Sequence, residues 1–311
     1  MVQIMAAERL TKLAHDRPRF EPAVNALIAH ISDFFLTIDE SEKKRPVDKK
    51  TTLGEQAALL RLLLLYTKST VLSEHSEKLA TNLRRSFNSD QGFVETPQVE
   101  QGTSLFMSRY YTGHASLALL KHSMASGNTD SREIAASALD WLANKYPIND
   151  DQYFHPALVP FHAFSIAQQY WQTGSSHHIN TLFYMADKLQ DLQSESEFPG
   201  RFFDPKEPQY GPPNVVRDAL STLTLMEALA IAEIEGDRSR VKQYQQSIWL
   251  ALDNLNSLQY DHGVVSGFPR PDKAVGALRF RHNDERIRLD GVIFGAEVFE
   301  RAALLIQSGK L

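Results

Sequence analysis

Residues 109–120 read Arg-Tyr-Tyr-Thr-Gly-His-Ala-Ser-Leu-Ala-Leu-Leu, a polar and aromatic turn that passes through Gly113 into an apolar helical run. Apolar side chains at helical spacing on most sides of such a run predict a buried helix. The recurrence of this construction along the chain indicates repeated units. The other polar turns that open apolar helices cover residues 53–56, 155–162, 217–219 and 288–291.

Short glycine turns follow several of the apolar helices. Gly127, Gly174 and Gly236 each stand between an apolar helix and a more amphipathic one, where glycine is a common helix terminator. The connections that lead back to the next apolar helix are long. Short turns on one side and long loops on the other, at a spacing of about 50 residues, predict a repeat of helical hairpins.

Six inner helices and five outer helices follow from this pattern. The inner, apolar helices are expected to begin near residues 2, 51, 114, 160, 216 and 289. The outer, amphipathic helices are expected over residues 20–36, 73–87, 131–145, 178–192 and 240–258. Short strands are expected over residues 92–95, 104–111 and 261–268.

Composition narrows the class of protein. The chain has 311 residues, of which 42% are hydrophobic, enough for a large core in one repetitive domain spanning residues 1–311. A net charge of -5 argues against nucleic-acid binding, which needs a basic surface. The absence of cysteine removes disulfides, thiol catalysis and thiolate metal sites. The longest apolar run, residues 59–65, is too short to cross a bilayer, and residues 1–15 lack the apolar centre of a signal peptide. We therefore expect a cytoplasmic protein without a membrane or nucleic-acid partner.

The hairpin pattern, with the Tyr-Thr-Gly-His-Ala and Arg-Leu-Asp-Gly helix starts, resembles the (α/α)6 six-hairpin toroids of glycosidases, polysaccharide lyases and sugar epimerases. It is similar, more distantly, to the toroids of terpene cyclases and protein prenyltransferase subunits. The resemblance covers the whole chain. It implies an all-α toroid of helical hairpins, with short β-hairpin insertions at one mouth. A linear helical solenoid is the alternative architecture.

The starts of the inner helices supply the candidate chemistry. If these helices are parallel, their N-termini and unpaired backbone N–H groups surround one mouth and favour an anionic ligand. Asp290 and Asp218 each follow an arginine in a first helical turn, and Glu55 begins a third inner helix. Two such carboxylates could divide acid and base roles in glycoside hydrolysis, or each could simply cap its helix. Arginines that could hold an anionic group in forked geometry lie beside them, at Arg217, Arg279, Arg281, Arg286 and Arg288.

Aromatic and histidine side chains form a second group of candidates. Tyrosine rings stack on sugars, and tyrosine and histidine can exchange the proton next to a uronate carboxyl, although the same residues can equally fill a core. The candidates for catalysis are Asp290, Asp218, His114 and Tyr111. The candidates for substrate binding are Arg288, Arg286, Arg217, Arg109, Tyr110, Glu55, His155 and His162. His155 and His162 have no third ligand at metal spacing, so we expect no metal and no other cofactor.

The leading hypothesis is a carbohydrate-active enzyme, namely a glycoside hydrolase, lyase or epimerase that acts on an acidic saccharide. An alternative is a terpene-cyclase-like enzyme, because Ile148-Asn149-Asp150-Asp151 is distantly similar to the acidic motif of class II cyclases, with Asp150 or Asp151 as proton donor. A second alternative is a non-catalytic scaffold whose mouth binds a partner. The sequence gives no indication of oligomeric state.

Overall fold

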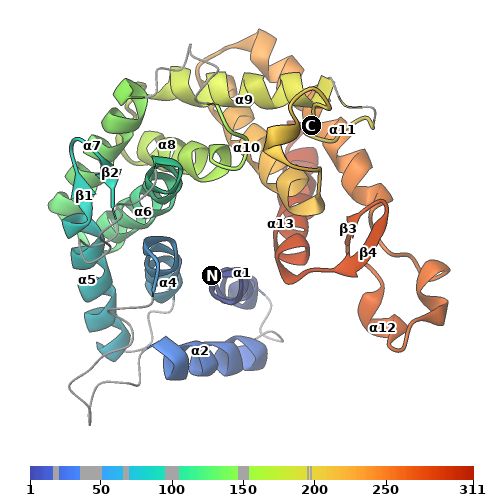
Figure 1. Cartoon of the computed structure of the whole chain (residues 1–311), viewed down its shortest axis with the longest axis horizontal. Helices are drawn as coiled ribbons and strands as arrows, with labels where there is room; N and C mark the ends of the chain where they lie inside the picture. The colour runs from blue at the N-terminus through green and yellow to red at the C-terminus, as the bar shows by residue number, and fades with distance from the viewer. Residues whose placement is uncertain are drawn as a thin grey trace. The chain divides into compact units, whose positions relative to one another are not determined.

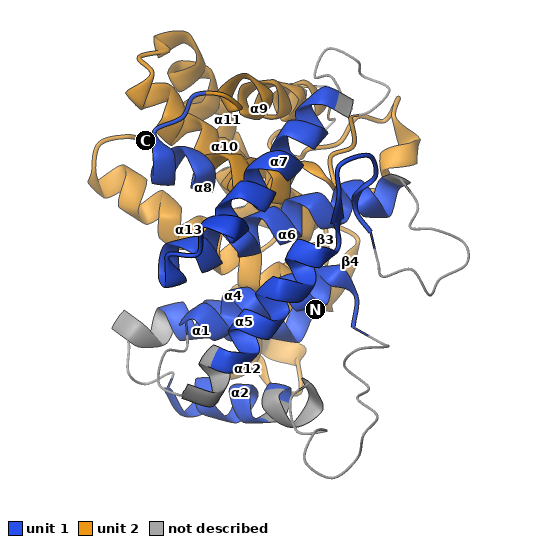
Figure 2. Ribbon diagram, turned by 90° about the vertical axis from the view of Figure 1, so that its left-hand side faces the viewer, with its two compact units in different colours: residues 1–147, 168–176 blue, residues 148–167, 177–311 orange. Residues whose placement is uncertain are grey.

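The structure is a computed structural model that describes residues 1–16, 21–35, 51–65, 70–94, 105–145, 154–194, 196 and 198–311. The chain divides into two compact units (Figure 2). Unit 1 comprises residues 1–147 and 168–176, and unit 2 comprises residues 148–167 and 177–311. Helix α8 (Val159–Thr173) contributes its first part to unit 2 and its last part to unit 1. Each unit is described below by itself.

Unit 1 contains two rows of helices (Figure 1). In the inner row, α4 packs between α1 and α6, and it is buried on nearly every side, as its apolar sequence predicts. In the outer row, α2 packs on α1, α5 on α4, and α7 on α6. The inner helices are α1 (Val2–Asp16), α4 (Leu53–Leu65) and α6 (Leu105–Ser126), and the outer ones are α2 (Glu21–Phe35), α5 (Thr70–Arg85) and α7 (Thr129–Lys145).

A buried ion pair joins two inner helices of unit 1. The Nε of Arg61 on α4 donates to Oε2 of Glu8 on α1 over 3.2 Å. The ammonium groups of Lys12 and Lys121 each lie 3.6 Å from the other oxygen of Glu8. Burial alone would raise the pKa of Glu8, but the three cations outweigh it and hold that pKa far below its ordinary value. Glu8 is therefore ionised inside the helix layer.

Unit 2 is organised around α10 (Val215–Ile234), which contacts α9 (Ile179–Ser194), α11 (Arg238–Ser257), α13 (Leu289–Gln307) and β3. The connection from α11 to α13 contains the short elements of the unit. They are η4 (Val264–Gly267), α12 (Pro271–Ala274), β3 (Arg279–Arg281) and β4 (Asp284–Ile287), and η3 (Pro208–Tyr210) lies earlier, before α10. The strands β3 and β4 form an antiparallel hairpin in which Arg279 faces Ile287.

The prediction of an all-α fold with small β-hairpins is confirmed, and the glycine turns are where the sequence indicates them. Gly127, Gly174 and Gly236 all have φ near +70°, the left-handed region that glycine adopts without a steric penalty. None of the described helices has the length and apolar character that a membrane span requires.

Two local predictions are wrong. Residues 105–111, expected as a strand, belong to α6, which begins at Leu105, so Gly113 and His114 lie inside a helix. The strand β2 (Gly92–Phe93) pairs instead with β1 (Phe87–Asn88). Residues 264–267, expected as part of a strand, form the 3-10 helix η4. In α6, the packing of a long helix outweighs the cost of about 1 kcal/mol for the internal Gly113.

The segment before α10 depends on close contact at one glycine. Gly200 has φ +86°, and a Cβ built on it would lie 1.9 Å from the backbone oxygen of Leu250 on α11. We expect Gly200→Ala to lower the free energy of unfolding by about 3 kcal/mol, because both the backbone angle and the contact become unfavourable.

Gly236→Ala is the matched control for this prediction. Gly236 has φ +73° but no atom within 4 Å of the built Cβ, so only the backbone term of about 1 kcal/mol applies. Urea unfolding of both variants measures the difference. Equal losses would show that the contact with α11 contributes nothing.

Candidate functional site

Asp218 lies in the first turn of α10 and is completely buried. The Asn214 side chain caps this helix by accepting from the backbone N–H of Arg217. Because Asn214 caps the helix, the Asp218 carboxylate does not, and it accepts hydrogen bonds from two other donors. The backbone N–H of Phe202 donates to Oδ1 over 3.2 Å, and the amide of Asn254 on α11 donates to Oδ2 over 3.2 Å. Asp218 thus ties α10 to α11 and to the preceding loop.

The charge of Asp218 is only partly compensated. Its nearest cation is Arg201, whose Nε lies 4.0 Å from Oδ2 and whose side chain is itself buried. Burial raises the pKa of Asp218 to about 6, against the opposing effect of the hydrogen bonds from Phe202 and Asn254 and the charge of Arg201. A carboxyl group with this pKa takes up a proton in mildly acidic solution.

Arg217 is directed toward the loop that precedes its helix. Its guanidinium donates to the backbone oxygen of Gly211 over 2.9 Å and to that of Tyr210. The ring of Tyr210 in turn makes an edge contact with the ring of His155, with centroids 5.3 Å apart. His155 also accepts a hydrogen bond from the backbone N–H of Ala157. Arg217 and His155, predicted separately as binding residues, therefore both contact one loop residue.

Asp290 also lies in a first helical turn, as the second residue of α13. Its two carboxylate oxygens accept from Nε and a terminal nitrogen of Arg288, over 3.0 Å and 2.6 Å, in a forked ion pair. The carboxylate is 10% exposed and the arginine 48% exposed. A Cβ built on the next residue, Gly291, would lie 2.7 Å from the side chain of Val215, the first residue of α10. The first turns of α10 and α13 are therefore side by side.

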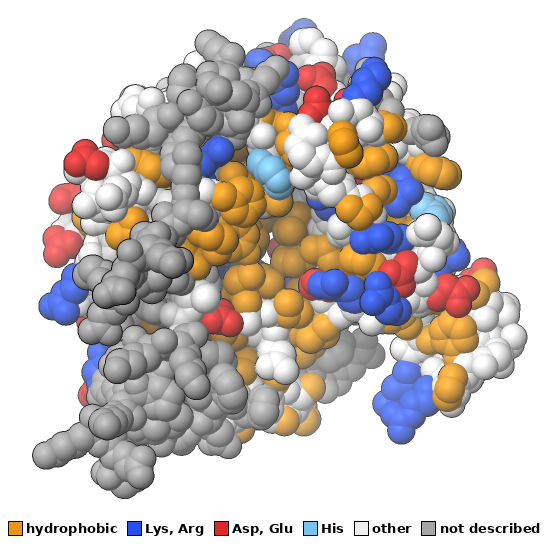
Figure 3. Space-filling view, in the orientation of Figure 1, with side chains coloured by type: hydrophobic (Ala, Val, Ile, Leu, Met, Phe, Trp, Pro, Cys, Tyr) orange, Lys and Arg blue, Asp and Glu red, His pale blue; other side chains and the backbone are white. Residues whose placement is uncertain are grey.

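The β3–β4 hairpin carries basic and acidic side chains close together (Figure 3). Arg286 forms an exposed forked ion pair with Asp284. The ring of Phe280 is buried beneath the hairpin, with the guanidinium carbon of Arg281 4.9 Å and that of Arg288 4.7 Å from its centroid. The binding candidates Arg286 and Arg288 are thus both paired with carboxylates.

The candidates on α6 lie inside a helix layer rather than at a helix start. His114 is fully buried on α6 and Tyr111 is 3% exposed. The ring of Tyr110 lies 4.6 Å from that of His114, and burial raises the pKa of Tyr110. Arg109 is half-buried on the same helix. The two tyrosines lie where α6 packs on α4, because a Cβ on Gly54 would be 3.7 Å from both of their rings.

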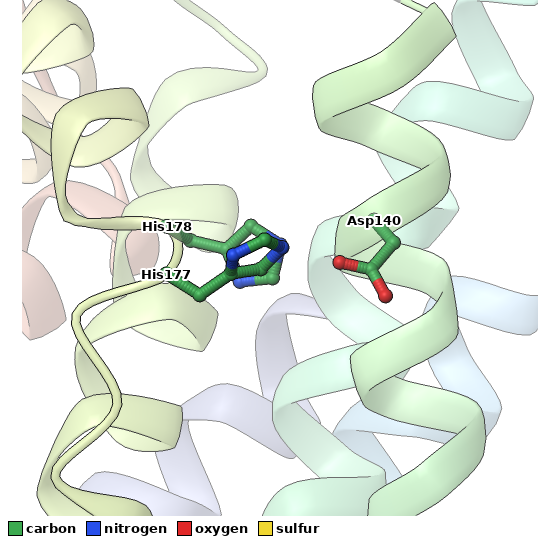
Figure 4. Close-up of side chains that lie close together, drawn as sticks. All are labelled: Asp140, His177 and His178. Carbon is green, nitrogen blue, oxygen red and sulfur yellow. The ribbon is translucent and has the colours of Figure 1, made fainter.

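Glu55 forms a capping box at the start of α4. Its carboxylate accepts from the backbone N–H of Thr52 over 3.0 Å, and the Thr52 hydroxyl accepts from the backbone N–H of Glu55 over 3.2 Å. His162 is 3% exposed on α8. The rings of His177 and His178 lie edge to face in unit 2, and Figure 4 draws them with Asp140, which belongs to unit 1. Asp150 and Asp151 lie outside the described residues.

Sequence reasoning missed two contributors to the Asp218 environment. Arg201 lies in an irregular loop and Asn254 lies in the last turn of α11, and neither belongs to a recognisable motif. The Gly-Arg-Phe sequence at residues 200–202, after a proline, is the one signal of a constrained loop. A separate open cavity of about 340 Å³ lies between α9 and α11. Its lining side chains are all uncharged, and none of the residues predicted for catalysis or substrate binding is among them.

The raised pKa of Asp218 makes stability depend on pH in a defined direction. The folded chain binds the proton more tightly than the unfolded chain, whose carboxyl has its ordinary pKa near 3.8. This group therefore favours folding most at low pH, and its contribution falls as pH rises from about 4 to about 6. At about 1.4 kcal/mol per pKa unit, the change is at most roughly 3 kcal/mol.

Asp218→Asn removes this dependence and keeps an oxygen that can accept from Phe202. We expect the variant to lose less stability, relative to the unchanged protein, at pH 7 than at pH 5. Urea unfolding at the two pH values measures this difference. A stability difference that is the same at both would contradict the raised pKa.

Comparison with known proteins finds similar structures but no match between the sequence and a protein family or a curated protein. No protein-family model and no curated protein matches the chain. The GH76A alpha-1,6-mannanase from a Salegentibacter species is similar, with a TM-score of 0.67 and 10% identity over 98% of this chain and 89% of that one. The GH76 alpha-mannanase of Bacteroides thetaiotaomicron has a TM-score of 0.63 and 10% identity, over 98% of this chain and 86% of that one. The chain therefore has the (α/α)6 toroid fold of these enzymes, as its hairpin repeat predicts.

Proposed function

We propose that this protein is a glycoside hydrolase that cleaves an oligosaccharide. The observation that carries the proposal is the likeness to two alpha-mannanases over 98% of the chain. Many unrelated activities share a fold, so the side chains at the helix starts must supply the rest of the argument. The adjacent first turns of α10 and α13, each with an arginine and an aspartate, support a site for a polar substrate.

The substrate that we propose is an acidic saccharide. Arginine is the side chain best suited to hold a carboxylate or sulfate, and unit 2 concentrates arginines on the β3–β4 hairpin and before α10. The two alpha-mannanases are named for their action on mannan. The arginines would bind an acidic substituent on a mannose-containing or related saccharide.

Of the catalytic candidates, Asp290 is the one that we propose to contact substrate. Its partner Arg288 is about half exposed, and a ligand that draws this arginine away would release the carboxylate. Asp218 is fully buried and bound from three sides, so its proposed part is to position the start of α10. His114 and Tyr111 are also buried, which supports a packing function for both.

Asp290→Asn tests this assignment. We expect turnover of a uronate-containing oligosaccharide to fall at least about 100-fold, the usual effect of losing an acid–base group, with little change in unfolding free energy. Release of reducing ends, followed by chromatography, measures turnover. Asp272→Asn, an exposed aspartate on α12, is the matched control and should keep full activity.

Full turnover by Asp290→Asn would remove Asp290 from catalysis. Loss of turnover in Asp150→Asn or Asp151→Asn instead would transfer the acid–base chemistry to that pair. Alpha-1,6-linked mannooligosaccharides serve as the neutral substrate in the same assay. Cleavage of these alone would retain the hydrolase and reject the acidic substrate.

A non-catalytic glycan-binding scaffold is the second candidate, and one observation favours it. The three carboxylates predicted at helix starts, Glu55, Asp218 and Asp290, are all engaged in a cap, buried hydrogen bonds or an ion pair. A scaffold predicts that oligosaccharides bind without being cleaved. Calorimetric binding with no reducing ends released over a day would support this reading against the hydrolase.

A further inference from the structure

We infer that Arg281, together with Arg201 and Arg217, forms an oxyanion site in unit 2 that holds the carboxylate of a uronic-acid residue. The identity of the sugar rests on the proposed function, whereas the oxyanion site rests on the side chains themselves. All three arginines lie within residues 177–311, so the site belongs to a single compact unit.

The arginines of this region differ in whether a carboxylate forms a forked ion pair with them. Arg286 and Arg288 form forked ion pairs with Asp284 and Asp290. Arg281 has no ion pair with any carboxylate among the described residues, and its buried Nε has no hydrogen-bond partner there. Its guanidinium lies over the face of Phe280, 4.9 Å away, and its charge helps to lower the pKa of Asp284 on the facing strand. A guanidinium held against a ring with unused donors is ready to bind a planar oxyanion.

Arg201 is a second arginine with an unused hydrogen-bond donor. Its side chain is 6% exposed, and its Nε has no hydrogen-bond partner within the part of the chain that the structure describes. It lies over the ring of Phe198 at 5.2 Å and contacts Asp218 only at 4.0 Å. Burying a charge without hydrogen bonds is costly, so a ligand that neutralises it is favoured.

The charges of the cluster do not balance. Burial lowers the pKa of both Arg201 and Arg217, Asp218 opposes this, and the nearby charge of Arg281 lowers both further. Burial, followed by Arg201 and Arg279, also lowers the pKa of His282. Arg201 and Arg217 therefore share the carboxylate of Asp218, and the carboxylate nearest to Arg281 along the hairpin, that of Asp284, is already held in a forked pair by Arg286. An anion beside Arg281 would restore the balance.

The positions of the three arginines assign them different parts. Arg281 and Arg217 are half-buried, whereas Arg201 is buried and lies over the ring of Phe198, on which His282, the neighbour of Arg281, stacks with centroids 5.7 Å apart. Arg217 is already fixed to the backbone oxygens of Gly211 and Tyr210. Arg281 is thus the residue that contacts the oxyanion, and the other two raise the local positive potential.

Titration of the whole chain with sodium glucuronate, at ionic strength held constant with sodium chloride, tests the inference. We expect Arg281→Gln to weaken glucuronate binding at least tenfold and Arg281→Lys to restore part of it, because lysine keeps the charge without the fork. Arg270→Gln, an exposed arginine of the same unit, should bind as the unchanged protein does. Sodium sulfate added as a competitor should displace glucuronate.

Unchanged binding by Arg281→Gln, or an equal loss in Arg270→Gln, would overturn the oxyanion site. The outcome is separable from that of the hydrolase. Glucuronate binding that depends on Arg281, in a protein without glycosidase activity, would retain this site and reject the hydrolase. Cleavage of neutral mannooligosaccharides by a protein that does not bind glucuronate would do the reverse. Thermal unfolding of each variant shows that the chain is folded.

Discussion

A carboxylate buried among polar partners from three separate segments is the constraint on which unit 2 depends. Asp218 can remain at the start of α10 only while the N–H of Phe202 and the amide of Asn254 supply its hydrogen bonds. Removing either donor would leave a buried acceptor unsatisfied, at a cost of about 1–3 kcal/mol. The loop before α10, the end of α11 and the first turn of α10 are therefore fixed together, and the arginines around them take their positions from this arrangement.

Unit 1 solves a similar problem in a different way. Glu8 is also a buried carboxylate, but Arg61, Lys12 and Lys121 surround it and keep it charged. For Asp218, the Nε of Arg201 is 4.0 Å away, the charge of Arg217 adds a smaller effect and both hydrogen-bond donors are neutral, so burial raises its proton affinity instead. The contrast explains why one acid serves as a fixed charge between helices while the other can change its charge near neutral pH. The same residue chemistry thus gives opposite pKa shifts because the number of nearby cations differs.

The helices and tight turns could be predicted from sequence because periodicity and glycine placement are local signals. The start of α6 could not be predicted, because Gly113 resembles a helix terminator and only burial against α4 keeps the helix continuous. The pairing of arginine and aspartate at the starts of α10 and α13 was visible in the sequence. Its partners were not, because Arg201 and Asn254 come from distant segments and become neighbours only after packing. Whether Asp290 and the arginines act on a saccharide stays a prediction.

The glycine turns have a consequence for how the chain folds. Gly127 and Gly236 each join an inner helix to the outer helix that packs on it, within a few residues of chain. The two helices of each hairpin therefore make an extensive contact that is local in sequence. Such local contacts close with little loss of chain entropy and form quickly. The α6–α7 hairpin can therefore assemble as it leaves the ribosome, before the residues that form the Asp218 environment have been synthesised.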